Sequence, residues 1–349
     1  MRVPRIMLRR VSKRAAKFLG MGLVAAVVLA AGIAPSGAEP VKIRASWVVP
    51  VANWASLLLE KKDLAKHLGQ SYVLEDQRFQ GTPPMITALA TGDIEIGDLA
   101  YSSLALAVEN AGMDDLRVIA DEFQDGVPGF YTDEFFVLAD GPVKKVEDLK
   151  GKVIATNAVG SAVDIAMRAM LRKHGLEDKR DYTVVEAPFP AMAAMLAEKK
   201  VDMIPGVPPF SYDPKLRSTT RVLFTQKEAI GASQMIVWAV RKSFIDKNRA
   251  ALVDFMEDTL RIVRWYTNPA NHAAAVAIAA KLTKRPPEAF DSWLFTNKDA
   301  YRDPNMIPNL DALQANINVQ KELGFLKAGF DVKAHSDLSI VREAAQRLK

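Results

Sequence analysis

The sequence predicts an α/β protein with two similar lobes and a helical C-terminal region. Three observations lead to this prediction. β-rich stretches alternate with helical ones from Val41 onward, a similar helix–turn–strand joint occurs at 89–96 and at 196–203, and the chain after Phe244 is almost wholly helical in pattern. The composition agrees with a globular chain, since 49% of the 349 residues are hydrophobic and 25% are charged.

The N-terminal 38 residues have the pattern of a secretory signal peptide. Seven basic residues and no acidic residue lie in 1–17, an apolar run follows at 18–34, and the small residues Ser36-Gly37-Ala38 supply a cleavage site. A membrane anchor is the alternative, but the apolar run is at the short end for a bilayer span. We expect cleavage after the triplet and export to the periplasm of a Gram-negative cell. The Arg9-Arg10 pair leaves the choice between the Sec and twin-arginine routes open.

Removal of this segment changes the charge of the chain. The full sequence has 46 basic and 41 acidic residues, a net charge of +5, but seven basic residues lie in 1–38, so the remainder carries 39 basic and 41 acidic residues and a net charge of −2. A chain without a basic excess lacks the electrostatic footprint of a nucleic-acid-binding protein. The absence of cysteine excludes a disulfide framework, a thiolate metal site and a lipid-modified cysteine. We expect a free, soluble protein.

The first part of the mature chain alternates between strand and helix patterns. Thr82 can cap a helix whose first turn suits Pro83, and Gly92 is a suitable end for that helix. The expected elements are a strand at 41–49, helices at 54–67 and 83–91, a strand at 94–99, a helix from 102, and strands at 117–120 and 135–138.

The segment 157–176, NAVGSAVDIAMRAMLRKHGL, has the pattern of an amphipathic helix that ends at Gly175. At its start, Gly160 and Ser161 direct backbone N–H groups and the positive end of the helix dipole outward, which is an arrangement that binds anions. A plain helix cap, in which Ser161 accepts a bond from the next turn, is the alternative.

The rest of the chain completes the second lobe and adds helices. Residues 190–207 have a helix–turn–strand pattern, and the main helical candidates of the C-terminal region lie at 250–265, 270–282 and 310–323. Strand candidates at 135–139 and 235–240 flank the second lobe, and a chain that crosses between lobes twice leaves a cleft and a hinge. We therefore expect a signal peptide at 1–38, lobe 1 at 39–138 and 238–349, and lobe 2 at 139–237.

No catalytic, metal-binding or cofactor-binding motif stands out. The phosphate-binding pattern GxxxxGK, a GxGxxG after a strand and the nucleophile turn GxSxG are all absent. The acidic pairs Asp114-Asp115 and Asp133-Glu134 adjoin turns, where carboxylates are usually solvated. The four histidines are widely separated in the sequence, at His67, His174, His272 and His335. We expect no enzyme activity, no metal and no cofactor.

Aromatic residues indicate a binding cleft. Six of them fall at predicted strand ends or turns, namely Trp47, Trp54, Tyr101, Phe130, Tyr131 and Phe210. Loop aromatics favour the lining of a cleft, and Trp and Tyr combine an apolar body with a polar tip, which suits a flat or aromatic organic acid. We expect two or three of them to pack in the lobe cores instead.

Taken together, these segments resemble the solute-binding proteins of ABC importers, in the nitrate, sulfonate and taurine type that includes relatives of pyrimidine-precursor-binding proteins. The resemblance rests on the signal pattern, the strand–loop–helix at 41–67, GTPPMITALATGDIEIGDL at 81–99, VEDLKGKVIATNAVGSAVDIAMRAMLRKHGL at 146–176, MLAEKKVDMI at 195–204 and IVWAVRKSF at 236–244. It implies a two-lobed clamshell with the ligand between the lobes. One departure is the segment 206–210, where many relatives carry a tryptophan and a proline.

The resemblance also implies where the ligand binds. By position, the binding loops of the family fall on 46–54, 80–82, 100–103 and 160–162. Together with the aromatic residues above, they make the candidate ligand-binding residues Trp47, Asn53, Trp54, Gln80, Gly81, Thr82, Tyr101, Ser102, Tyr131, Gly160, Ser161, Ala162 and Phe210.

The sequence thus predicts a monomeric, periplasmic binding protein that captures a small organic anion, such as a sulfonate or a carboxylate, and delivers it to an ABC permease in the inner membrane. Two alternatives stay open. The first is a protein of the same fold that serves a receptor kinase. The second is an enzyme of pyrimidine-precursor synthesis, against which the lack of cysteine and the signal pattern argue.

Overall fold

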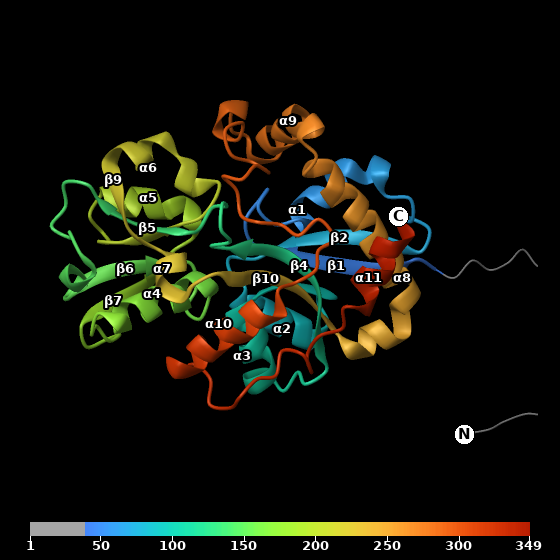
Figure 1. Cartoon of the computed structure of the whole chain (residues 1–349), viewed down its shortest axis with the longest axis horizontal. Coiled ribbons are helices and arrows are strands. Elements are labelled where there is room, and N and C mark those ends of the chain that lie inside the picture. Colours follow the sequence, from blue (N-terminus) through green and yellow to red (C-terminus); the bar gives the residue numbers. More distant parts are fainter. Residues whose placement is uncertain (1–38) are drawn as a thin grey trace, which may run out of the picture. The chain divides into compact units, whose positions relative to one another are not determined.

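The computed structural model describes residues 39–349 (Figure 1). The predicted signal peptide at 1–38 lies outside the described residues. The described chain is a mixed α/β structure with sheets of five, three and two strands, so the predicted fold class is confirmed. None of the helices in 39–349 combines the length and the apolar composition that a membrane-spanning segment needs.

The five-stranded sheet has the strand order β2-β1-β3-β10-β4. Strand β1 pairs in parallel with β2 and β3, whereas β10 is antiparallel to both of its neighbours. The strands span Val41–Trp47 (β1), Tyr72–Arg78 (β2), Ile96–Ala100 (β3), Leu116–Asp125 (β4) and Ser233–Arg241 (β10). Every residue of β3 and the first eight of β10 are buried, which places these two strands at the centre of the sheet.

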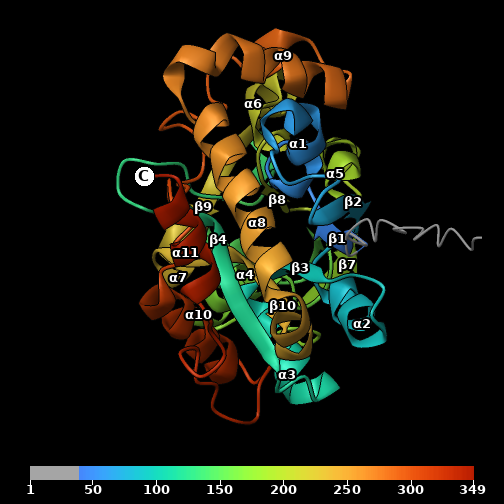
Figure 2. The same ribbon diagram turned by 90° about the vertical axis from the view of Figure 1, so that its right-hand side faces the viewer.

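Helices cover both faces of this sheet. The period-two alternation of β10 divides its side chains, because Val237 and Ala239 face one apolar cluster while Trp238 and Val240 face another. On the Trp238 side, α8 runs beside α11 (Figure 2). The helices on that side are α1 (Ala55–Leu58), α8 (Lys242–Tyr266), α9 (His272–Thr283) and α11 (Ser339–Arg347), and those on the other side are α2 (Pro83–Thr91), α3 (Tyr101–Ala111) and α10 (Leu310–Glu322).

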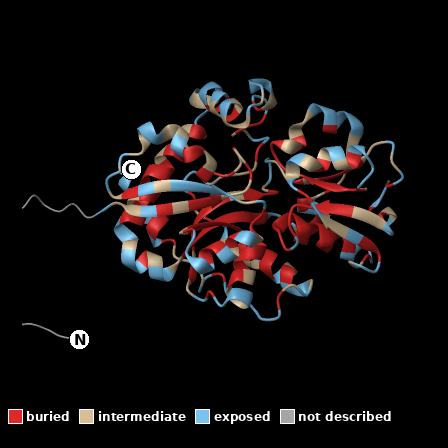
Figure 3. Cartoon of the chain, turned by 180° about the vertical axis from the view of Figure 1, so that it is seen from behind, coloured by how far each residue is buried: buried red, intermediate tan, exposed pale blue. Residues whose placement is uncertain are grey.

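The two smaller sheets come from the middle of the chain. Strand β5 lies between β8 and β9 and is antiparallel to both, and β6 pairs in parallel with β7. Their bounds are Glu134–Leu138 (β5), Lys152–Thr156 (β6), Tyr182–Glu186 (β7), Ile204–Gly206 (β8) and Thr220–Thr225 (β9). The helices of this region are α4 (Ala162–Lys173), α5 (Phe189–Ala197), α6 (Pro214–Thr219) and α7 (Gln226–Ile230). In Figure 3 the inner strands are buried, whereas edge strands such as β2 and the outer faces of the helices are partly exposed.

The strands that we expected to cross between lobes each belong to one sheet. β5 is the middle strand of the three-stranded sheet, and β10 lies wholly in the five-stranded sheet. The chain instead passes between the sheets in the loop 126–133, and again just after α7. The sequence of an apolar, β-rich run does not reveal the sheet to which the strand belongs. Pairing with strands that are distant in the sequence decides this.

Two further differences concern individual elements. The helix predicted at 54–67 is a short α1 followed by a 3-10 segment at Leu59–Leu64, with a break in helical geometry at Lys61. Other 3-10 turns occur at Val146–Leu149, Phe210–Tyr212, Pro269–Asn271 and Pro287–Ala289. Strands β2, β7 and β9 and helices α6, α7 and α11 were not among the expected elements.

Candidate ligand-binding cleft

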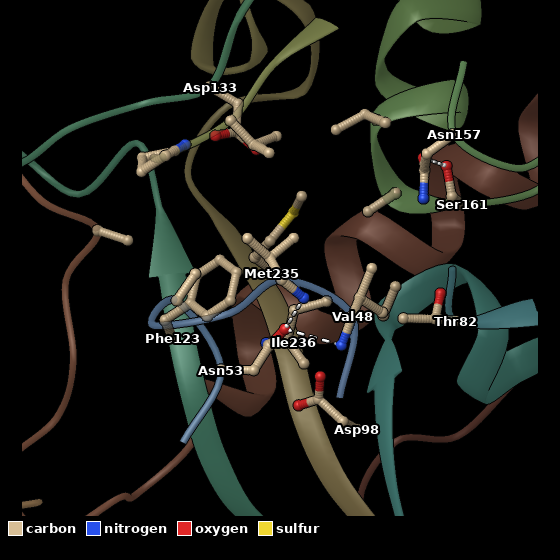
Figure 4. Close-up of a pocket in the computed structure, with 18 of the residues that line it drawn as sticks. Val48, Asn53, Thr82, Asp98, Phe123, Asp133, Asn157, Ser161, Met235 and Ile236 are labelled. Atoms are coloured by element: carbon tan, nitrogen blue, oxygen red, sulfur yellow. Dashed lines mark hydrogen bonds between the residues drawn. The ribbon is translucent and has the colours of Figure 1, made fainter. Parts of the chain in front are cut away.

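A pocket lies where the ends of the five-stranded sheet meet the smaller sheets, and it is called the cavity below (Figure 4). Its lining comes from segments far apart in the sequence: the loop after β1, the ends of β3, β4 and β10, the turn before α4, the start of α5 and the segment 299–302. Of the predicted ligand-binding residues, Asn53, Thr82, Ser161 and Ala162 line this cavity.

Asn53 shapes the loop after β1. Its Oδ1 accepts hydrogen bonds from the backbone N–H groups of Val48 (3.1 Å) and Val49 (2.8 Å), and both valines line the cavity. An Asn side chain that closes a turn onto its own backbone is a common device for holding an irregular loop. Asn53 therefore positions an apolar wall of the cavity.

Thr82 and Ser103 form a buried hydroxyl pair, with 2.7 Å between their oxygens. Thr82 immediately precedes α2, but its side chain does not cap that helix as we expected. The bond to Ser103, on α3, instead ties the starts of two helices together beside the cavity.

The turn before α4 is tightly hydrogen-bonded to itself. The Ser161 hydroxyl donates to Oδ1 of Asn157 (2.8 Å) and accepts from the N–H of Asp164 (3.4 Å), so it is a helix cap. The N–H of Gly160 donates to Oδ2 of Asp164 (2.9 Å), and that of Ser161 donates to the carbonyl of Ala158 (3.1 Å). The protein itself therefore uses two of the N–H groups that we expected to face an anion.

Two other amides at this helix end stay available. The N–H groups of Ala162 and Val163, the first two residues of α4, have no acceptor among the hydrogen bonds of the described chain, and both residues line the cavity. Such N–H groups, with the positive end of the helix dipole, stabilise an anionic group.

The loop before α2 and the turn before α4 close over one side of the cavity. The side-chain amide of Gln80 donates to the carbonyl of Asn157 (3.3 Å), and a Cβ placed on Gly81 would lie 2.9 Å from Cβ of Ala158. Nearby, the Tyr101 hydroxyl donates to the carbonyl of Ala162 (3.0 Å). These contacts join segments that belong to different sheets.

The other predicted aromatic and polar residues lie outside this cavity. Trp54 is buried and stacks on Phe295, with 5.4 Å between ring centroids, and Tyr101 and Ser102 are fully buried. The Trp47 indole donates to Asp76 (2.7 Å), and the Tyr131 hydroxyl donates to the carbonyl of Gly206 (3.2 Å).

Gln80 and Phe210 line a second hollow, which shares Val48, Val49 and Phe189 with the cavity. Trp54 and Tyr101 thus fulfil the expectation that some of the aromatics pack in the cores.

Acidic residues were missed by the sequence reasoning. Asp98, on β3, lines the cavity and is fully buried, and neither of its carboxyl oxygens has a hydrogen-bond partner in the described chain. Burial, with the neighbouring carboxyl of Glu122, raises the pKa of Asp98 well above its usual value. A charged residue within a predicted short strand, between Ile96 and Leu99, was a sequence signal that could have indicated it.

Asp133 is a second acid of the cavity and contradicts the expectation of a solvated carboxylate. It is 5% exposed, and burial together with Asp125 raises the pKa of its carboxyl well above the usual value. The single basic residue in the lining is Arg302, which pairs with Asp299 (3.0 Å) and donates to the carbonyl of Ala52 (3.0 Å). The charge of Arg302 is therefore already balanced.

Residues 36–280 match the model of the NMT1-like family. The chain belongs to this family. The taurine-binding periplasmic protein of Escherichia coli (strain K12) is 24% identical over 188 residues, which cover 53% of this chain and 54% of the relative, so the chain spans about half the length of that protein.

Solved structures share the fold of this NMT1-like protein. The alkanesulfonate-binding protein SsuA from Xanthomonas axonopodis pv. citri, bound to MOPS, has a TM-score of 0.63 at 18% identity and covers 88% of this chain and 98% of its own. The periplasmic nitrate-binding protein NrtA from Synechocystis PCC 6803 has a TM-score of 0.69 at 15% identity, with 89% and 90% covered. The desulfurization enzyme DSZB has a TM-score of 0.62 at 14% identity, with 88% and 100% covered.

One group of potential metal ligands lies away from the cavity of this NMT1-like protein. His67 is 3.4 Å from Glu257 and 3.9 Å from Asp254. The two carboxylates are also held by arginines, since Arg347 lies 2.8 Å from Asp254 and Arg261 lies 2.6 Å from Glu257. The two carboxylates of this cluster thus belong to an ion-pair network with arginines.

Proposed function

We propose that this NMT1-like protein is the extracytoplasmic solute-binding component of an ABC importer. It would capture a small organic solute with an acidic group, a sulfonate or a carboxylate, and deliver it as a monomer to a permease in the inner membrane. The observation that carries the proposal is the cavity between the sheets, whose lining includes Ala162 and Val163, the two residues at the start of α4 whose N–H groups have no acceptor in the described chain. Family membership and the names of the relatives support it.

The proposal includes two lobes that close around the solute. Sheet membership supports one lobe built on β1–β4 and β10 and another built on β5–β9, which moves the expected boundaries from 138 and 237 to the connections at 126–133 and 231–232. A ligand that contacts both lobes favours the closed state by its difference in affinity. Small-angle scattering of residues 39–349 should show a smaller radius of gyration with ligand than without, and an unchanged radius would contradict the closure.

Binding without catalysis is part of the proposal, although the fold is shared with a desulfurization enzyme. The chain has no cysteine, and no histidine lines the cavity in the described part of the chain. A nucleophile activated by a neighbouring base, which hydrolytic chemistry usually needs, is therefore not assembled there.

A thermal-shift and calorimetry screen of residues 39–349 tests the function. The probes are ethanesulfonate, taurine, nitrate, propionate and an aromatic carboxylate. A ligand present at about 100 times its dissociation constant adds about 2.7 kcal/mol to the free energy of unfolding, so a true solute should raise the unfolding temperature clearly. Failure of every acidic probe to bind would contradict the proposed function.

A further inference from the structure

We propose that the solute carries, besides its acidic group, a positively charged nitrogen that binds to Asp98 on the floor of the cavity. The inference rests on the proposed function, because it specifies the solute of the same cavity. In Figure 4, Asp98 lies below Asn53, while Asn157 and Ser161 lie on the opposite side of the cavity. The two sides therefore offer different chemistry.

The first argument is the state of Asp98. Its side chain is 0% exposed, it lines the cavity, and both carboxyl oxygens lack a hydrogen-bond partner in the described chain. A buried carboxyl without a partner is unfavourable, and native proteins normally satisfy such groups. An ammonium group that enters the cavity would supply N–H donors and the opposite charge together.

The second argument is the balance of charge in the cavity. Asp98 and Asp133 have no basic partner in the lining, because the charge of Arg302 is already balanced by Asp299. A simple anion would gain the amides of α4 but would leave the buried carboxyls of Asp98 and Asp133 without a basic partner. A solute with both an acidic group and a cationic nitrogen, such as an aminosulfonate or an amino acid, can satisfy both sides.

The acidic residues around Asp98 imply that a proton is released when an aminated solute binds. The ionisable groups around Asp98 are Glu122, and next to it Asp121 and Arg302. The indole N–H of Trp238, the residue of β10 that pairs with Asp98 of β3, lies near enough to lower the pKa of this carboxyl, but it does not meet the geometry of a hydrogen bond. Because burial raises the pKa of Asp98 well above its usual value, an ammonium group that forms an ion pair with it favours release of the carboxyl proton. Affinity for an aminated solute should therefore rise with pH.

Matched probe pairs test the inference on residues 39–349. The pairs are taurine with ethanesulfonate, β-alanine with propionate, and 4-(aminomethyl)benzoate with 4-methylbenzoate, so that the members of each pair differ in the cationic nitrogen. Calorimetry should give an affinity at least about tenfold higher for the aminated member of the pair that fits. In two buffers of different ionisation enthalpy, it should also show proton release on binding.

Substitutions locate the effect. Asp98→Asn should reduce the preference for the aminated probe over its amine-free partner to less than about threefold. Asp93→Asn, which changes an exposed carboxyl five residues earlier, is the matched control and should keep the preference.

The outcomes separate the two proposals. Equal or tighter binding of the amine-free acids overturns the amine inference and leaves the proposed function intact. The amine inference is also overturned if Asp98→Asn folds and still binds the aminated probe more tightly than its amine-free partner. Binding of the aminated probe without proton release would overturn it as well. In either case, Asp98 and Glu122 would be a structural pair that shares a proton. If no probe of any pair binds, the proposed function falls and the inference falls with it.

Discussion

Glu122 is a buried acid whose ionisation opposes folding. Its side chain accepts a hydrogen bond from the N–H of Trp54, its other carboxyl oxygen has no partner in the described chain, and burial raises its pKa to about 8. In the unfolded chain the same group has a pKa near 4.5. Between these values the unfolded chain has released a proton that the folded chain retains, so stability falls as pH rises from about 4.5 to about 8.

The substitution Glu122→Gln should remove this loss. A glutamine can still accept the bond from Trp54, but it never has to ionise. We expect the variant to be more stable than the parent by more than about 1 kcal/mol at pH 8, and by much less at pH 5, since one pKa unit corresponds to about 1.4 kcal/mol. Urea unfolding at the two pH values measures this. Asp140→Asn, at an exposed carboxyl, should show no such trend, and an equal difference at both pH values would contradict the argument.

The predicted residues that line the cavity, Asn53, Thr82, Ser161 and Ala162, lie in loops that the family resemblance pointed to. Asn53 and Ser161 follow turn and cap rules that operate within a few residues, and both line the cavity. Phe123, Met235 and Arg302 reach the cavity through the pairing of β4 with β10 and the return of the C-terminal segment, which no local pattern encodes.

The start of α4 contributes both to the stability of the fold and to the proposed binding of the acidic group. Ser161→Ala removes the bond to Asn157 and the cap on Asp164, and it should lower the free energy of unfolding by about 0.5–2 kcal/mol. If the proposed acid site is correct, ethanesulfonate should also bind more weakly, because the turn that aims the Ala162 and Val163 amides loosens. Thermal unfolding and calorimetry measure the two effects. Ser218→Ala, at an exposed helical serine, is the control. Unchanged stability would contradict the role of the cap.

The bounds of an element were predicted well where helix caps and hydrophobic periodicity agree. They were predicted poorly where contacts with a distant segment determine the local conformation. Helix α4 begins and ends within two residues of its signals. The helix expected at 54–67 breaks instead, and the N–H groups of Lys66 and His67 donate to Asp258 of α8 (2.9 and 2.8 Å). Strand β2 was missed because it is an edge strand with mostly exposed, polar side chains, which hides the apolar alternation.

For the molecule as a whole, we expect the contact between Gly81 and Ala158 to limit how closely the two groups of sheets approach in the proposed closure. A Cβ at Gly81 would lie 2.9 Å from Cβ of Ala158 and 3.0 Å from Nδ2 of Asn157, which is closer than real Cβ contacts. Gly81→Ala should therefore hold the closed arrangement apart. We expect a larger radius of gyration with ligand and an affinity weaker by about fivefold or more, which is about 1 kcal/mol.

Two variants check this interpretation. Gly329→Ala adds the same methyl group where the nearest atom, Nζ of Lys321, is 4.0 Å away, so it should change neither radius nor affinity. In the Gly81→Ala background, Ala158→Gly removes the Cβ atom with which the new methyl group would clash. This second substitution should restore much of the affinity. A loss of affinity that persists in the double variant would show that the contact does not limit closure.

The central position of β10 has a consequence for the order in which the protein assembles. Strand β4 has β10 as its only partner within the five-stranded sheet, and residue Leu116 pairs with Arg241. Strands β5 to β9 all lie between residues 134 and 225, so they can pair before the chain has been made as far as β10. Loop closure over more than a hundred residues is slow compared with local pairing. The middle of the chain should therefore fold first, and the region formed by both ends should stay incomplete until residue 241 arrives.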